Sequence, residues 1–128
     1  LLAVPLVESG YRNLSPRSGP GAGLWMFIRP TARHYGLEVF ATRDQRLDVR
    51  AETGAAMRMF SDLQRRFRDW PLALMAYNSG SARVEAGMNA TRSHDAWTLY
   101  RAGYGNDPDY LARTMAVMLI LANPRLLD

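Results

Sequence analysis

Apolar residues recur at every third or fourth position through most of the chain, and this spacing predicts helices. The longest such pattern runs from Asp48 to Arg68, with Asp48 placed as an N-cap and Glu52 in the early helix. Its apolar positions are Val49, Ala55, Ala56, Met59, Phe60, Leu63 and Phe67. No segment convincingly alternates apolar and polar residues as a half-buried strand does. The pattern therefore predicts an all-α fold.

Glycine and proline predict where the shorter helices begin and end. Gly10, Gly36 and Gly80 are suited to the position after a last turn, and Pro30 is suited to a first turn. We expect these helices at 1–8, 29–36, 71–80, 81–88 with Ser81 as its cap, 95–102 and 107–122.

The remaining segments limit the architecture. Residues 12–23 and 89–95 lack periodicity and are expected to be loops. The apolar run at 115–122 is far shorter than the ~20 residues of a membrane-spanning helix, so we expect it in the core and expect no membrane-spanning segment.

A chain of 128 residues supports one domain, here 1–128. Because the chain starts inside an apolar run, we expect this domain to be excised from a longer protein.

Charge and composition exclude several kinds of site. All 16 basic residues are arginine, and the formal net charge is +4. This charge suits an anionic partner, although the scattered arginines are explained more simply by an arginine-rich genome. The absence of cysteine excludes disulfides and thiolate metal sites, and His34 and His94 are isolated. We therefore predict no metal and no cofactor.

Glu8 is the acidic residue whose position calls for an explanation. It ends an apolar run and directly precedes Ser9-Gly10 and a glycine-rich loop, whereas the other acidic residues suit caps or solvated helix faces. Burial at this position would raise the pKa of Glu8 and keep a proton available near neutral pH, as a general acid requires. Position alone favours a structural role over a catalytic one.

Four ordered motifs and one charged element resemble those of the lytic transglycosylases of the goose-type-lysozyme-like (SLT) group, closest to the membrane-bound type D branch. They are "LVESGY" (6–11), "GAGLWMF" (21–27), "PTARHYGL" (30–37), Asp44-x-Arg46-x-Asp48 and "DWPLALMAYNSG" (69–80). The resemblance implies an α-helical lysozyme-like fold. It also implies cleavage of the β-1,4 bond between N-acetylmuramic acid and N-acetylglucosamine in peptidoglycan, with formation of a 1,6-anhydro ring. The implied location is the bacterial cell envelope, periplasmic or associated with the outer membrane.

The same resemblance assigns roles to individual residues. Glu8 is implied as the single catalytic acid and base, and Tyr77 as the tyrosine beside the reacting sugar, with a core aromatic as its alternative. Trp25 and Phe27 are expected either to stack on sugars or to belong to the core. The substrate-binding residues implied are Ser18, Met26, Phe27, Tyr77, Asn78 and Tyr110.

Departures from the family pattern keep other functions open. Met26 stands where the family has a glutamine that hydrogen-bonds the saccharide, and Arg17 and Ser18 replace a Ser-Pro pair. These changes favour, as an alternative, a glycan-binding pseudoenzyme. A lysozyme-type hydrolase is a further alternative, but Asp44 or Asp48 would have to supply its second carboxylate, and both have the pattern of framework residues. A basic nucleic-acid binder is a minor alternative without a recognisable motif, so the expected partner is the peptidoglycan glycan strand and not nucleic acid.

Overall fold

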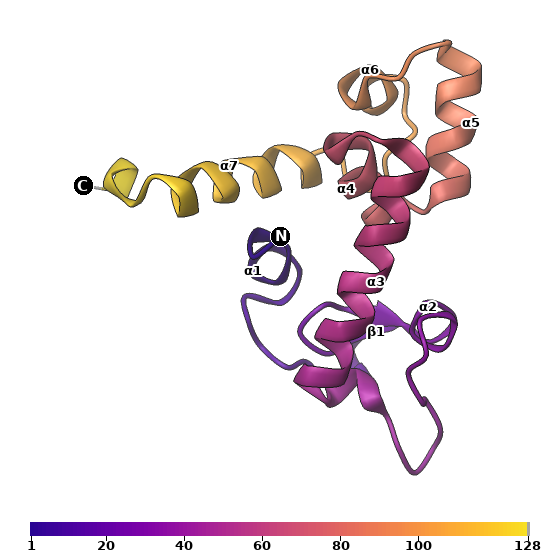
Figure 1. Cartoon of the computed structure of the whole chain (residues 1–128), viewed down its shortest axis with the longest axis vertical. Coiled ribbons are helices and arrows are strands. Elements are labelled where there is room, and N and C mark those ends of the chain that lie inside the picture. The colour runs from indigo at the N-terminus through magenta and orange to yellow at the C-terminus, as the bar shows by residue number, and fades with distance from the viewer. Residues whose placement is uncertain (128) are drawn as a thin grey trace. The chain divides into compact units, whose positions relative to one another are not determined.

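Helices dominate the fold of residues 1–127, which the computed structural model describes (Figure 1). The helices are α1 (Ala3–Ser9), α2 (Arg29–His34), α3 (Val49–Phe67), α4 (Trp70–Ser79), α5 (Ser81–Thr91), α6 (Ala96–Arg101) and α7 (Tyr110–Ala122). Short 3₁₀ turns lie at Pro16–Ser18, Gln45–Leu47 and Pro124–Leu127. The all-α class expected from the periodicity is confirmed.

One small hairpin corrects the expectation that the chain forms no strand. Strands β1 (Gly21–Ala22) and β2 (Phe27–Ile28) pair antiparallel, with Ala22 opposite Phe27. Each strand has only two residues, so an alternating pattern has no length in which to appear. Residues 23–26, which we call the hairpin turn, connect the two strands.

Contacts along the chain separate two compact units, and each is described by itself. The first comprises Leu1–Met59 together with the chain from Thr114 onward, and the second comprises Phe60–Arg113. In the first unit, α2 packs against β2. Asp48 caps α3 as expected, since its Oδ1 accepts hydrogen bonds from the amides of Arg50 and Ala51 at 3.0 Å. The buried residues of this unit include Ala3, Val4, Ala22, Trp25, Phe27, Ala32, Leu37, Val39, Ala55 and Ala56.

In the second unit, α4, α5 and α6 pack against one another (Figure 1). Helix α4 starts where Asp69 accepts a hydrogen bond from the amide of Leu72 at 2.8 Å, and it ends before Gly80, whose φ is +86°. Gly87 permits α5 to pack closely against α6, because a β-carbon at Gly87 would lie 3.0 Å from the side chain of Leu99 in α6. The buried residues include Phe60, Leu63, Leu72, Leu74, Met75, Val84 and Leu99.

Several predicted boundaries differ from the structure. Ser81 is the first residue of α5 and not its cap, and the helix continues to Thr91 into the expected loop. Helix α7 begins at Tyr110 and ends before Pro124. The expectation that 115–122 lies in the core is wrong, since none of these residues is fully buried and Leu119 is 60% exposed. A helix that is apolar on every side cannot bury all of its faces in a chain of this size.

Candidate active site

Glu8 lies in the last turn of α1, and its side chain is half-buried. The chain leaves the helix through Gly10, whose φ of +62° suits glycine and whose amide donates to the carbonyl of Leu6 at 3.0 Å. The guanidinium Nε of Arg12 donates to the carbonyl of Ser9 at 3.1 Å. These contacts satisfy carbonyls that a helix end otherwise leaves without partners, so the turn that carries Glu8 is well fixed.

Ser9 ties this helix end to the hairpin turn. Its hydroxyl lies 2.8 Å from the carbonyl oxygen of Leu24 and 3.0 Å from that of Pro5, and its single proton serves one of them at a time. The side chain is buried, so neither bond competes with bulk water. The residue that follows Glu8 in the sequence is thus bonded to the loop that follows β1.

Glu52, a residue of α3, also binds the hairpin turn. It lies in the first turn of α3, is fully buried, and accepts hydrogen bonds from the amide of Leu24 at 2.7 Å and that of Trp25 at 3.2 Å. Gly23 allows this approach, because a β-carbon at its φ of +84° would lie 2.3 Å from Oε1 of Glu52. Burial raises the pKa of Glu52 to about 7, against the opposing effects of the backbone amides and of Arg46.

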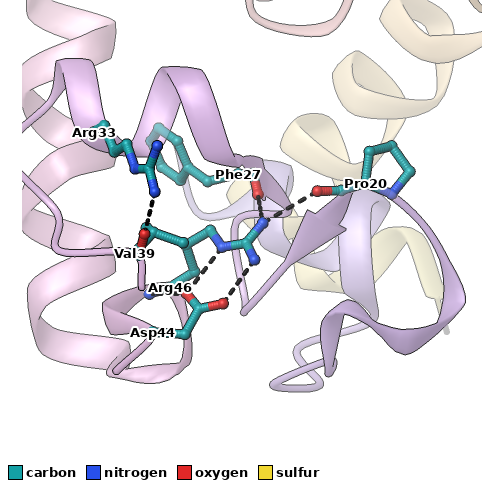
Figure 2. A network of polar contacts seen from close by, with 6 residues as sticks. All are labelled: Pro20, Phe27, Arg33, Val39, Asp44 and Arg46. Atoms are coloured by element: carbon teal, nitrogen blue, oxygen red, sulfur yellow. Dashed lines mark hydrogen bonds and ion pairs between the residues drawn. The ribbon is translucent and has the colours of Figure 1, made fainter. Parts of the chain in front are cut away.

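Arg46 is the second fully buried charge of the first unit, and Figure 2 shows its surroundings. Its Nε and Nη2 bind both carboxylate oxygens of Asp44, at 2.9 and 2.6 Å, while Nη1 donates to the carbonyls of Pro20 and Phe27 at 3.1 Å. The hydrogen bond from Arg46 holds the pKa of Asp44 below its usual value. Asp44 and Arg46 therefore belong to the framework that fixes both ends of the hairpin.

The three residues "WMF" of the hairpin take different environments. Trp25 and Phe27 are buried, with the Trp25 indole donating to Thr53 Oγ1 at 2.9 Å and the Phe27 ring edge-on to Tyr35. The core alternative accounts for both rings. Met26 lies between them, is half-buried and has a φ of +56°, which unbranched residues adopt at a cost. Among these three, it is the side chain that reaches the surface.

A hollow of about 460 Å³ lies beside the hairpin. Its lining residues are Pro16, Gly19, Pro20, Ile28, Arg29, Pro30 and Arg46. The prolines and Ile28 make its walls largely apolar, and Arg29 is exposed. Ser18, predicted to bind substrate, falls in the 3₁₀ turn next to this hollow along the chain, but its side chain lies outside the described part of the structure.

The other predicted substrate-binding residues belong to the second unit. Tyr77 and Asn78 are half-buried near the end of α4, and the Tyr77 ring stacks on Phe60 with centroids 4.6 Å apart. Asn106 donates its side-chain amide to the carbonyl of Asn78 at 3.3 Å, which fixes this helix end. Tyr110, the first residue of α7, is 2% exposed and packs in the interior.

The described residues contain no group of three or more His, Cys, Asp or Glu side chains placed to hold a metal ion. Within residues 1–127, no helix is both long enough and apolar enough to cross a bilayer.

Sequence reasoning missed the importance of Glu52 and the burial of Arg46. A signal for Glu52 exists, because it precedes Ala55 and Ala56 by three and four residues and therefore shares the apolar face of α3. A charged residue on an apolar face indicates a specific partner inside the protein. For Arg46, the flanking Asp44 is the corresponding signal.

Comparison with known proteins adds a family to this geometry. Residues 1–100 match the family model described as "Transglycosylase SLT domain". Two curated proteins named membrane-bound lytic murein transglycosylase D, from Escherichia coli strains K12 and O6:H1 (CFT073), are each 34% identical to this chain over 130 residues. The matched region covers 98% of this chain but 28% of each relative, so the chain spans little more than a quarter of their length.

Proposed function

The chain belongs to the transglycosylase SLT family, and from this premise we propose that it is a peptidoglycan lytic transglycosylase with Glu8 as its single acid and base. The observation that carries the proposal is the placement of Glu8, half-buried on a helix end fixed to the hairpin turn. A partly buried carboxyl group on a rigid element suits an acid that must keep its proton and its position.

The proposed reaction uses one carboxyl group twice. Glu8 protonates the glycosidic oxygen as the bond between N-acetylmuramic acid and N-acetylglucosamine breaks. The N-acetyl group of the substrate stabilises the positive charge at the anomeric carbon. Glu8, now a carboxylate, then takes the proton of the C6 hydroxyl, whose oxygen bonds to the anomeric carbon and closes the 1,6-anhydro ring. Water is not consumed, and Glu8 regains its proton.

The remaining carboxylates of residues 1–59 support assigning both steps to Glu8. Glu38 pairs with Arg43 at 2.7 Å, Asp44 pairs with Arg46 at 2.6 Å, and Asp48 caps α3. Glu52 is buried, and its two oxygens accept the amides of Leu24 and Trp25. A hydrolase that used Asp44 or Asp48 to activate water would have to release that carboxylate from its framework role. The transglycosylase reaction requires no such release.

Tyr77, Asn78 and Met26 are proposed to bind the glycan. Tyr77 has a phenol that can donate a hydrogen bond near the reacting sugar, and its ring is steadied by Phe60. Met26 offers only a weakly accepting thioether where an amide would both donate and accept. The altered side chain favours a glycan-binding pseudoenzyme as the second candidate.

The substrate and the location are proposed together. The formal net charge of +4 suits a wall polymer that carries carboxylates. We propose that the protein acts in the bacterial cell envelope, periplasmic or at the outer membrane. Its two relatives are named as membrane-bound, which supports the association with the envelope.

Mass spectrometry of purified peptidoglycan after incubation with the protein tests the proposal. Wild type is expected to release 1,6-anhydromuramic products, and Glu8→Gln to release none while remaining folded. Glu38→Gln is the matched control, because it neutralises an exposed carboxylate of the same unit. Hydrated products would indicate a lysozyme-type hydrolase. Binding to sacculi without products from wild type would indicate the pseudoenzyme.

A further inference from the structure

Glu52 is a buried carboxyl group that the proposed reaction does not use. Its two oxygens accept the amides of two consecutive residues, Leu24 and Trp25, at 2.7 and 3.2 Å. A fully buried acidic residue on the apolar face of a helix is costly, because burial disfavours its charged form. A helix start needs no such residue for capping, since Asp48 already supplies the N-cap of α3.

One of the two residues held by Glu52, Leu24, also contacts the neighbour of Glu8. The amide of Leu24 donates to Glu52, and the carbonyl of the same residue accepts from Ser9 Oγ at 2.8 Å. A continuous series of bonds therefore runs from α3 through Leu24 to Ser9 at the end of α1. Every member is buried or half-buried, so water cannot readily replace these bonds.

We propose that Glu52 is a positioning residue for Glu8, acting through Leu24 and Ser9, and that it never touches the substrate. This inference rests on the proposed function. Displacement of a catalytic group by about 1 Å can reduce turnover roughly a hundredfold without removing any contact to the substrate. Loss of the Glu52 acceptors is therefore expected to lower kcat and to leave KM nearly unchanged.

The variant Glu52→Gln keeps the shape of the side chain but replaces one acceptor oxygen with an NH₂ group that cannot accept. We expect kcat to fall by roughly ten- to a hundredfold, with KM within about twofold of wild type. Glu38→Gln, the exposed control, should leave both parameters within about twofold. A higher KM with an unchanged kcat would overturn the proposal.

A double-mutant cycle distinguishes positioning from general destabilisation. Ser9→Ala removes the hydroxyl at the other end of the series, so Ser9→Ala combined with Glu52→Gln should lower kcat little more than the worse single variant does. Independent effects on kcat that simply multiply would show that the two residues act separately. All variants are compared well below the unfolding temperature of the least stable one.

Amide hydrogen exchange tests the same series of hydrogen bonds without depending on catalytic activity. In Glu52→Gln, the amides of Leu24 and Trp25 should exchange faster, and so should the amide of Gly10, which closes the end of α1. Faster exchange confined to residues 24 and 25 would overturn the positioning role. If wild type forms no anhydro product, the proposed function fails, while the exchange measurement still decides whether Glu52 fixes the helix end.

Discussion

A β-carbon on Gly23 would lie 2.3 Å from Oε1 of Glu52 and 2.0 Å from the carbonyl oxygen of Arg46. Real β-carbons do not approach other atoms so closely, and the φ of +84° at Gly23 adds strain for any other residue. The glycine therefore permits two features at once, a left-handed turn and a buried acceptor for the next two amides. The hairpin turn therefore depends on the left-handed backbone of Gly23 and on the space that its missing side chain leaves for the Glu52 carboxyl group.

Gly23→Ala is accordingly expected to destabilise the protein by roughly 3 kcal/mol, because both the backbone conformation and the packing resist a methyl group. Urea unfolding followed by circular dichroism would measure this loss. Gly19→Ala is the matched control, since Gly19 has extended backbone and nothing within 4 Å of an added β-carbon. Equal stability of the two variants would contradict the steric account.

The stability of the fold should depend on pH through Glu52. In the unfolded chain this group loses its proton near pH 4.5, whereas burial raises the pKa of Glu52 to about 7 in the folded protein. Its contribution to the free energy of unfolding is fully present below pH 4.5 and falls as pH rises to 7. The total loss is on the order of 3 kcal/mol and is complete above that window.

The variant Glu52→Gln isolates this effect, because its amide does not titrate. The difference between the unfolding free energies of wild type and Glu52→Gln should decrease from pH 4.5 to pH 7 and then level off. Arg46 faces Glu52, and Asp44 stays ionised over this range because the hydrogen bond from Arg46 lowers its pKa. A difference that is constant over this range would show that Glu52 is ionised in the folded protein throughout.

Asp44→Asn should destabilise the first unit by about 3 kcal/mol, because it leaves the buried guanidinium of Arg46 without its counter-charge. Thermal unfolding at pH 7 provides the measurement. Asp62→Asn serves as comparison, since the Asp62–Arg65 pair is exposed and should contribute less than about 1 kcal/mol. If the two substitutions destabilise the protein equally, the buried pair stabilises the framework no more than an exposed pair does.

Met26→Gln is expected to strengthen glycan binding by about 0.5 to 1.5 kcal/mol, because an amide can exchange hydrogen bonds with sugar hydroxyl groups. Calorimetric titration with a peptidoglycan fragment, using the Glu8→Gln background to prevent cleavage, would detect the change. Unfolding of Met26→Gln should resemble that of wild type, since both side chains are unbranched at this φ of +56°. Unchanged or weaker binding would mean that the surface has adapted to the methionine.

Periodicity and capping residues predicted most of the helical framework. Asp48 accepts amide hydrogen bonds at the start of a helix, as predicted, and Asp69 and Asp95 do the same at the starts of α4 and α6. Gly10 and Gly36 have positive φ after the last turn, as expected. These features are local, so a single sequence contains them. Ser81 was predicted as a cap but is the first residue of α5, because Gly80 occupies the capping position.

Features that depend on distant segments were not predictable in the same way. The hairpin brings residues 21–22 and 27–28 together over a span too short for alternation. The burial of Arg46 depends on the carbonyls of Pro20 and Phe27, which lie 26 and 19 residues earlier in the chain. Glu52 depends on amides 27 and 28 residues earlier in the chain. From sequence alone, charged residues such as Arg46 and Glu52 are expected at the solvent-exposed surface. Here their contacts with distant segments bury them.

The left-handed backbone at Met26 also restricts which side chains evolution can place at this corner of the surface. Valine, isoleucine and threonine are strongly disfavoured at a φ of +56°, because their branched β-carbons crowd the main chain. Variation there is confined to glycine, asparagine and flexible unbranched residues. Relatives that change their preference for glycans at this position should therefore do so by exchanging long, flexible side chains and not by building a rigid wall.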